Sequence, residues 1–407
     1  MQGINVKSEI GNLKKVILHR PGDELLNLTP DTLEQLLFDD IPFLPVAQEE
    51  HDAFANILRG EGVEVVYLED LMAEALDTDP SLREKFLDQW IFEAGIRTDL
   101  YTNIIKDYIN SNYPGTKDMV MKTMAGINLQ ELPQQHTHLL VDMVSDRSKL
   151  VCDPMPNLYF TRDPFANIGN GVSINRMYSH TRNRETIYGD YIYRYHPDFK
   201  DTPRYYSRDY TYHIEGGDIL NISATTLAIG ISQRTEPDAI DQLAHTVFND
   251  PTSTVDTILA FNIPSSRAFM HLDTVFTQID RDKFTIHPGI MGPLTVFEIK
   301  SDGKGGTTIR ERHDDLEHIL TEYVGEKVEL LPCGGGDRIA AEREQWNDGS
   351  NTLCVRPGTV VVYQRNNVTN DLLYKHGINV LEMPSAELSR GRGGPRCMSM
   401  PAWREAL

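Results

Sequence analysis

One order of predicted elements recurs three times along this chain of 407 residues: a short β-branched strand, a loop, an amphipathic helix and a second strand. The first strands begin at residues 15, 226 and 359, and the helices span 48–58, 238–248 and 369–376. The second strands span 63–68, 256–261 and 378–383. Although the three stretches share almost no residue identities, their common order predicts a pseudo-symmetric α/β fold.

A different pattern separates the first repeat from the second. From about residue 70 to residue 145, charged and apolar residues follow helical spacing with few β-branched runs, which predicts an inserted helical subdomain. Strand patterns return at 157–162 and 172–175, on either side of an Asn170-Gly171 pair. Such a pair is typical of tight turns, so these two strands are expected to form a hairpin.

Composition excludes several classes of protein. The chain has 60 acidic and 39 basic residues and a formal net charge of -21, which argues against nucleic acid because phosphate binding needs a concentrated basic surface. This acidity favours a cationic substrate, or it only aids solubility. No apolar run approaches the length of about 18 residues that a membrane span needs.

His136 and His138 have no third ligand in a metal-binding pattern, so a structural role is expected for them.

The most informative single residue is Cys397, in a loop that carries three glycines and three arginines. The other three cysteines are widely scattered, with no CxxC spacing, so a reducing cytoplasm fits the chain best. A thiol near positive charge, on a backbone that a ligand can approach closely, is typical of a nucleophile. The alternative is a buried structural cysteine.

Two further segments place acids and a histidine on predicted strands. Pro164 forbids a central strand from continuing past Asp163, so this acid is expected at a strand end, where sites form. Alternation along 271–276 places His271 and Asp273 on one face of a strand. The alternatives are a surface ion pair for Asp163 and a structural role for the histidine.

Two more carboxylates, Glu215 and Asp218, flank the Gly216-Gly217 pair, where a ligand can come close to the backbone. The alternative is a turn capped by Asp218. A thiol, a histidine and several carboxylates suit attack on an electron-poor carbon. The excess of acids favours a cationic electrophile, and a planar guanidinium is the group that carboxylates bind in bidentate fashion.

Six segments together form a specific set: 9–13, 36–40, 153–164, 214–218, 270–273 and the Cys397 loop. Through them the chain resembles the arginine deiminase family of the pentein superfamily, nearly from end to end. The resemblance implies a five-bladed pseudo-symmetric α/β propeller of ββαβ modules around a central polar site. It also implies a single catalytic domain over 1–407, with the helical subdomain inserted at 70–145.

The resemblance further implies hydrolysis of L-arginine to L-citrulline and ammonia, the first step of arginine catabolism, without metal or cofactor. Cys397 would attack the guanidinium carbon and form a covalent amidino-cysteine (S-alkylthiouronium) intermediate. His271 would shuttle protons to the departing ammonia and from the hydrolytic water. Asp163 and Asp273 would clamp the guanidinium nitrogens, and Glu215 would orient the histidine.

The family pattern also implies positive partners for the α-carboxylate of the substrate, at Arg182, Arg234 and Arg392. A shift of two residues would replace the first of these by Arg184. Four more positions are implied around the substrate: Asn157, Phe160, Gly391 and the backbone of Leu37. Asp218 is expected to have a supporting role.

Two other functions remain open at this point. One is a related hydrolase that acts on agmatine or methylated arginines. Agmatine is disfavoured, because it lacks the α-carboxylate that the predicted arginine residues would bind. The other is a non-catalytic arginine sensor. For the enzyme itself we expect L-arginine as the small-molecule partner, no nucleic acid or membrane partner, and a homo-oligomer in the cytoplasm.

Overall fold

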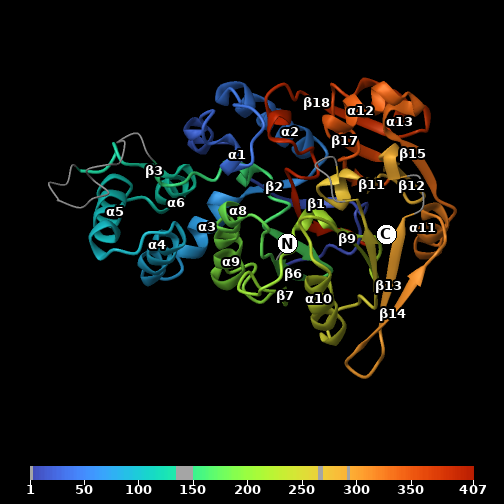
Figure 1. Ribbon diagram of the computed structural model, residues 1–407, viewed down its shortest axis with the longest axis horizontal. Helices are drawn as coiled ribbons and strands as arrows, with labels where there is room; N and C mark the ends of the chain where they lie inside the picture. The colour runs from blue at the N-terminus through green and yellow to red at the C-terminus, as the bar shows by residue number, and fades with distance from the viewer. Residues whose placement is uncertain (1–2, 134–149, 265–268, 291–293) are drawn as a thin grey trace.

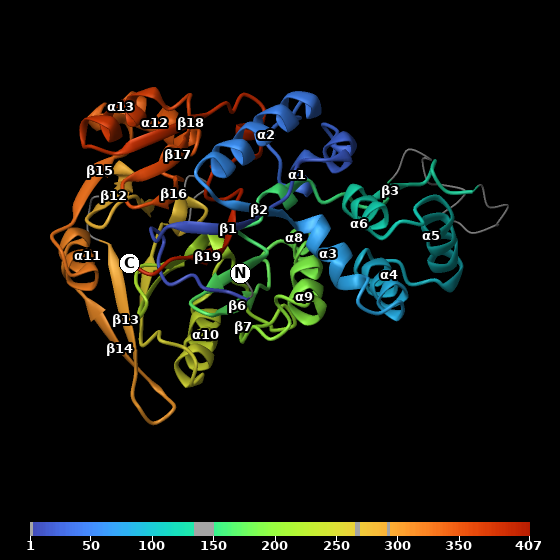
Figure 2. The same ribbon diagram turned by 180° about the vertical axis from the view of Figure 1, so that it is seen from behind.

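A computed structural model describes residues 3–133, 150–264, 269–290 and 294–407 (Figures 1 and 2). Residues 134–145 of the expected helical insertion, with His136 and His138, therefore lie outside the described residues. Among the helices within the described ranges, none combines the length and apolar character that crossing a membrane requires.

Five sheets of the described part share one connectivity: a middle strand is antiparallel to one neighbour and parallel to the other, and a helix lies in the chain between the parallel pair. The first sheet has the order β19 (Met400–Arg404), β1 (Leu13–Leu18) and β2 (Glu64–Tyr67), with helix α2 (Leu44–Gly60). The second has β5 (Phe165–Ile168), β6 (Gly171–Ile174) and β7 (Arg204–Tyr206), with α9 (Thr186–Tyr195).

The remaining three units follow the same plan. They are β8 (Ile219–Asn221), β9 (Thr226–Ile231) and β10 (Thr257–Asn262) with α10 (Pro237–Asn249); β11 (Phe276–Gln278), β12 (Lys283–Ile286) and β15 (Glu329–Pro332) with α11 (Leu316–Val324); and β16 (Leu353–Arg356), β17 (Thr359–Tyr363) and β18 (Asn379–Met383) with α13 (Asn367–Lys375). A hairpin of β13 (Thr295–Ser301) and β14 (Thr307–Arg312) extends the sheet of β10 and projects from the body (Figure 1).

The three repeats predicted from the sequence are the units of β1, β9 and β17, so these predictions are confirmed. All five residues of β17 are buried. This is expected for a strand that is covered on both faces, and it explains the nearly continuous apolar run in its sequence. The other two units were not recognised as repeats in the sequence, although the family resemblance implied five modules. Their strands β7 and β11 have three residues each, too few to show a period.

Four helices fill the stretch after β2: α3 (Leu68–Leu76), α4 (Ser81–Glu93), α5 (Asp99–Asn112) and α6 (Thr116–Ala125). The predicted helical character of this region is therefore confirmed as far as it is described. In Figure 1, α4, α5 and α6 lie at one end of the long axis, opposite α11. Phe86 of α4 packs edge-to-face on Tyr191 of α9, at 5.3 Å between ring centroids. These helices thus share one hydrophobic core with the sheets of β6 and β9.

Two strand predictions near the candidate site are wrong. Residues Pro156–Tyr159 form a short 3₁₀ helix, which suits a proline at its start, and the hairpin strand begins only at Phe165. Residues Leu272–Thr274 also form a 3₁₀ helix, directly after His271. There the Thr274 hydroxyl donates to His271 O at 2.7 Å, and such local side-chain bonds compete with a strand ladder.

Candidate active site

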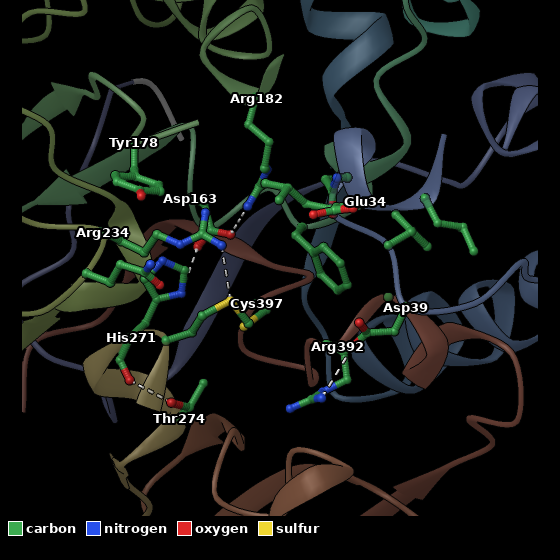
Figure 3. Close-up of a pocket in the computed structure, with 18 of the residues that line it drawn as sticks. Glu34, Asp39, Asp163, Tyr178, Arg182, Arg234, His271, Thr274, Arg392 and Cys397 are labelled. Carbon is green, nitrogen blue, oxygen red and sulfur yellow. Dashed lines mark hydrogen bonds and ion pairs between the residues drawn. The ribbon is translucent and has the colours of Figure 1, made fainter. Parts of the chain in front are cut away.

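A polar cavity of about 740 Å³ opens where loops from several of the five units converge (Figure 3). Ten of the predicted site residues line it: Leu37, Asn157, Phe160, Asp163, Arg182, Arg234, His271, Gly391, Arg392 and Cys397. The two other predicted catalytic residues, Glu215 and Asp273, lie behind this lining with no exposed surface. The predicted set therefore gathers around one cavity.

The Gly216-Gly217 pair is required by close packing at the back of the cavity. A Cβ on Gly216 would lie 1.9 Å from the carbonyl oxygen of Arg162. A Cβ on Gly217 would lie 2.7 Å from the ring of His271 and 3.0 Å from Asp163 Oδ1. The two glycines thus let the histidine and the acid approach the backbone of this turn.

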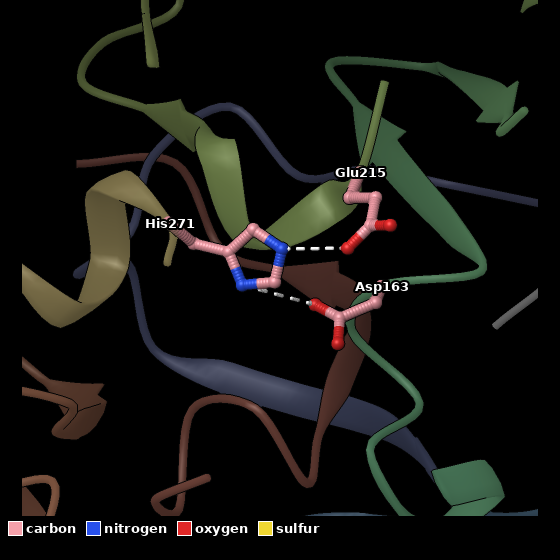
Figure 4. Close-up of side chains that lie close together, drawn as sticks. All are labelled: Asp163, Glu215 and His271. Atoms are coloured by element: carbon pink, nitrogen blue, oxygen red, sulfur yellow. Dashed lines mark hydrogen bonds and ion pairs between the residues drawn. The ribbon is translucent and has the colours of Figure 1, made fainter. Parts of the chain in front are cut away.

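His271 and Glu215 form a buried ion pair (Figure 4). His271 Nε2 lies 2.7 Å from Glu215 Oε2, and its Nδ1 lies 4.0 Å from Asp163 Oδ1. Burial alone would lower the pKa of His271, but the charge of Asp163 and the hydrogen bond to Glu215 raise it to about 9. Burial alone would raise the pKa of Glu215, but Arg234 and His271 lower it to about 2. The imidazole is therefore protonated at neutral pH.

Arg182, rather than Arg184, lines the cavity. Its Nη1 donates to Asp163 Oδ2 at 2.9 Å, while its Nε and Nη2 donate to Glu185 at 3.0–3.2 Å. Arg184 donates to the carbonyl oxygen of Asp153 at 3.0 Å instead. Arg182 thus holds one oxygen of the acid that was expected to clamp the substrate.

Arg234 extends across the cavity between two groups. Its Nη1 lies 3.7 Å from Glu215 Oε1, and its Nη2 donates to the sulfur of Met270 at 3.4 Å. The guanidinium carbon lies 5.4 Å from the ring centroid of Tyr178, within the range of a cation–π contact. These contacts fix the arginine at the wall beside His271.

Cys397 presents its thiol to the cavity from the loop before β19. Its Sγ lies 3.7 Å from Asp273 Oδ2, and its backbone N–H donates to Asn351 Oδ1 at 3.0 Å. Burial and the neighbouring carboxylates, Asp273 and then Asp163, raise the pKa of the thiol well above its ordinary value. The interpretation that the loop arginines favour thiolate is therefore wrong for the unliganded site, because Arg396 only partly opposes these effects.

Two carboxylate oxygens beside the thiol are buried and unsatisfied. Asp273 Oδ2 accepts from Arg396 Nη1 at 2.7 Å, but Asp273 Oδ1 has no hydrogen-bond partner among the described residues. Asp163 Oδ1 likewise lacks one within the described ranges. Since a buried acceptor left unpaired is costly, these atoms are poised to accept hydrogen bonds from a ligand.

The outer rim is built by two loops with strained backbone. Leu37 and Arg392 have φ of 60° and 63°, and with Asp348 at 58° they are the non-glycine residues with positive φ in the described part of the chain. Asn157 Nδ2 donates to the carbonyl oxygen of Leu36 at 2.7 Å and so holds the first loop. Arg392 Nη1 lies 3.4 Å from Asp39 Oδ2.

Phe160 lines the cavity beside Gly391. A Cβ on Gly391 would lie 1.9 Å from the hydroxyl of Tyr159 and 3.0 Å from the Phe160 ring. Asp218 lies deeper, where Ser232 and Thr235 donate to its Oδ2 at 2.7 and 2.6 Å. Asp218 therefore does not line the cavity, and it does more than cap a turn. Its position behind the site is a supporting one.

Asp163, Glu215 and His271 form a group whose ligand atoms lie within 4.8 Å of one another, as a metal site would need. This donor set suits a metal poorly. A ligating imidazole must be deprotonated, whereas the surrounding acids raise the pKa of His271 to about 9. An ion-pair cluster is the better description of these three side chains.

Sequence reasoning missed several residues that contact the predicted set, among them Met270, Asn351 and Arg396. Met270 and Arg396 directly precede His271 and Cys397, so adjacency alone was a usable signal. Asn351 lies in a segment without any recognised motif. Only the tertiary structure brings it to the site.

Comparison with known proteins adds independent findings. Residues 34–404 match the sequence model of the family described as arginine deiminase. The chain is 61% identical to the arginine deiminase of Treponema denticola over the full length of both chains. It is 55% identical to that of Clostridium perfringens, over 100% of this chain and 99% of the relative.

The fold is also similar to that of solved structures. An amidinotransferase of saxitoxin biosynthesis from Microseira wollei aligns with a TM-score of 0.55 at 15% identity, over 99% of this chain and 98% of the other. At this identity the likeness concerns the mixed α/β fold alone.

Proposed function

Because the chain belongs to the arginine deiminase family and hydrolyses L-arginine to L-citrulline and ammonia, we propose that Cys397 is its nucleophile and that the reaction passes through an amidino-cysteine intermediate. One observation carries this proposal. The two unsatisfied carboxylate oxygens, on Asp163 and Asp273, belong to the two acids that most raise the pKa of the thiol. A guanidinium offers five donors in a plane and a positive charge, which together match both oxygens.

Substrate binding and thiol activation are coupled in this proposal. A guanidinium held by Asp163 and Asp273 neutralises the charges that raise the pKa of Cys397. The thiol then loses its proton to solvent, and its sulfur attacks the guanidinium carbon. The substrate thus helps to generate the nucleophile that attacks it.

His271 supplies the proton transfers. As the carbon–sulfur bond forms, protonated His271 gives its proton to the leaving nitrogen, which departs as ammonia. Water then attacks the amidino carbon, and the neutral imidazole takes the proton of that water. The carbon–sulfur bond breaks as the hydroxyl of the adduct loses its remaining proton to solvent, citrulline leaves, and the thiolate regains a proton from solvent. Glu215 holds the ring throughout by its 2.7 Å bond to Nε2.

Three arginines in the cavity lining provide the basis for substrate choice. Arg182, Arg234 and Arg392 line the cavity, and they are proposed to bind the α-carboxylate with Asn157 and Gly391 nearby. Phe160 is proposed to line the substrate stem, and the backbone of Leu37 is proposed to belong to a loop over the site. Agmatine lacks the carboxylate that these arginines would bind.

The larger organisation is part of the same proposal. The five units of common connectivity support a five-bladed propeller of ββαβ modules around the cavity. We propose a single domain over 1–407, with residues 70–145 as an inserted helical subdomain. The proposal also includes a homo-oligomer in the cytoplasm without metal, cofactor, nucleic acid or membrane partner. The net charge of -21 supports the absence of a nucleic-acid partner, and the four free cysteines support a reducing cytoplasm.

A substrate panel tests the proposal. Ammonia release is measured with arginine, agmatine and methylated arginines, for the wild type and for Cys397→Ala, with and without a chelator. Turnover of arginine alone, lost in the variant and unaffected by chelator, is expected. Near-normal turnover by a folded Cys397→Ala protein contradicts the nucleophile, and binding of arginine without ammonia release by the wild type indicates a sensor.

A further inference from the structure

We propose that Asn351 is a positioning residue that sets the thiol of Cys397 against Asp273. Its Oδ1 accepts the backbone N–H of Cys397 at 3.0 Å, and its Nδ2 donates to the carbonyl oxygen of Asp273 at 3.2 Å. The side chain is fully buried. One planar amide therefore joins the nucleophile to the acid beside it. The inference rests on the proposed function of these two residues.

The two residues that Asn351 joins come from different parts of the fold. Cys397 lies in the loop before β19, whereas Asp273 lies in the 3₁₀ helix Leu272–Thr274. Apart from the Asn351 amide, the described residues link them by the 3.7 Å approach of Sγ to Asp273 Oδ2 and by the bond from the neighbouring Arg396 to the same carboxylate oxygen. An amide with a donor and an acceptor in fixed directions restrains both backbones at once.

The segment that carries Asn351 is itself held in place by hydrogen bonds. Its backbone N–H donates to the carbonyl oxygen of Asp348 at 3.0 Å. The neighbouring Ser350 accepts from Thr277 at its carbonyl oxygen, at 2.8 Å, and Gln345 donates to the carbonyl oxygen of Thr274. The segment is therefore fastened to Thr274 and Thr277, which follow Asp273 in the chain.

The nucleophile loop closes tightly onto this segment. A Cβ on Gly394 would lie 2.6 Å from the carbonyl oxygen of Asn351 and 2.9 Å from its Cβ. The third glycine of the Cys397 loop thus permits the approach by which the amide reaches the cysteine. This accounts for a glycine that lies outside the cavity lining.

Asn351 does not line the cavity, so it acts only through its two partners. A misplacement of about 1 Å between reacting groups can lower turnover by about 100-fold. Loss of the amide is therefore expected to lower kcat, whereas the arginines that face the cavity remain in place and leave KM nearly unchanged.

The test compares Asn351→Ala with Asn366→Ala. Asn366 is also a buried asparagine, and its Nδ2 donates to the carbonyl oxygen of Asn347, in the same segment, at 2.9 Å. We expect kcat to fall about 10- to 100-fold in Asn351→Ala, with KM within about threefold of wild type. Asn366→Ala is expected to lose thermal stability but to keep kcat. Equal kcat in the two folded variants overturns the proposal.

Asn351→Asp gives a second readout that a purely structural role would not move. Its carboxylate still accepts from Cys397 but faces the carbonyl oxygen of Asp273 without a proton to donate. Protonation restores the donor, so the ratio of its kcat to that of wild type is expected to rise as the pH falls. If Asn351→Ala does not fold, a ratio independent of pH overturns the proposal. Full activity in Cys397→Ala would instead refute the proposed function.

Discussion

Arg396 Nη1 lies 2.7 Å from Asp273 Oδ2 and leaves the other oxygen of that carboxylate unsatisfied within the described part of the chain. The same arginine pairs with Glu9 through Nε and Nη2, at 3.1 and 3.2 Å. One oxygen of the buried Asp273 carboxylate is therefore held by the protein, and the other is available to a substrate.

Replacement of this acid by its amide should remove the charge that draws in a guanidinium. We expect kcat/KM for arginine to fall at least about 30-fold in Asp273→Asn, since loss of one partner of a desolvated charge pair costs about 2–5 kcal/mol. Citrulline formation measures the effect. The control is Asp302→Asn, at an exposed acid in the projecting hairpin. A change below about threefold would contradict the clamp.

The reactivity of the thiol should follow the same charge. Because Asp273 raises the pKa of Cys397, the wild type should react slowly with iodoacetamide at neutral pH. Asp273→Asn lowers this pKa and should accelerate alkylation about 10-fold, equivalent to a shift of about one unit. Mass spectrometry locates the label, and Cys397→Ala gives the background from the other cysteines. A slower or equal rate in Asp273→Asn would refute the assigned cause.

The pH profile should report the His271–Glu215 pair. The pKa of His271 is raised from 6.5 to about 9, so the protonated acid is present below this value and is lost as the pH rises through it. Glu215→Gln removes a charge that raises the pKa, so the alkaline limb of kcat/KM should move from near pH 9 toward 6.5.

The matched control for this profile is Glu74→Gln. Glu74 also bonds a histidine, with its Oε2 2.8 Å from His196 Nε2, but outside the cavity. Its profile should coincide with that of the wild type. An alkaline limb that stays near pH 9 in Glu215→Gln would show that Glu215 does not set the pKa of the catalytic acid.

A methyl group on the diglycine turn should displace the histidine. The Cβ of Gly217→Ala would lie 2.7 Å from the ring of His271, so kcat should fall about 100-fold while the protein remains folded. Gly60→Ala is the control, because its Cβ would meet nothing within 4 Å. Circular dichroism and ammonia release are measured for both. Wild-type turnover in Gly217→Ala would show that the ring can move without loss.

Much of the fold could be predicted because three of its middle strands, β1, β9 and β17, are covered on both faces. The apolar runs of β1, β9 and β17 stand out for that reason, and each repeat was found. The units of β7 and β11 escaped because their strands are short. Before β11, hydrogen bonds from side chains turn the chain into a 3₁₀ helix where alternation alone predicts a strand.

The identities of the candidate site residues were accessible, but their pairings were not. The sequence motifs led to Asp163 and Arg182, yet the contact between them depends on the fold around both. The direction of the Cys397 pKa shift was equally hidden, because burial and two acids far away in the sequence decide it. Asn351 carries no reactive group and no motif, so only its contacts reveal a role.

The strained backbone at Leu37, Asp348 and Arg392 has a consequence for protein engineering. Each such position stores roughly 1–3 kcal/mol that glycine would release. Two of them line the cavity, and the third accepts a hydrogen bond from the residue that positions the thiol. A search for heat-resistant variants that scores only backbone strain would select these positions first. The selected variants would gain thermal stability but lose activity, so stabilising changes are better sought on outward-facing helix surfaces.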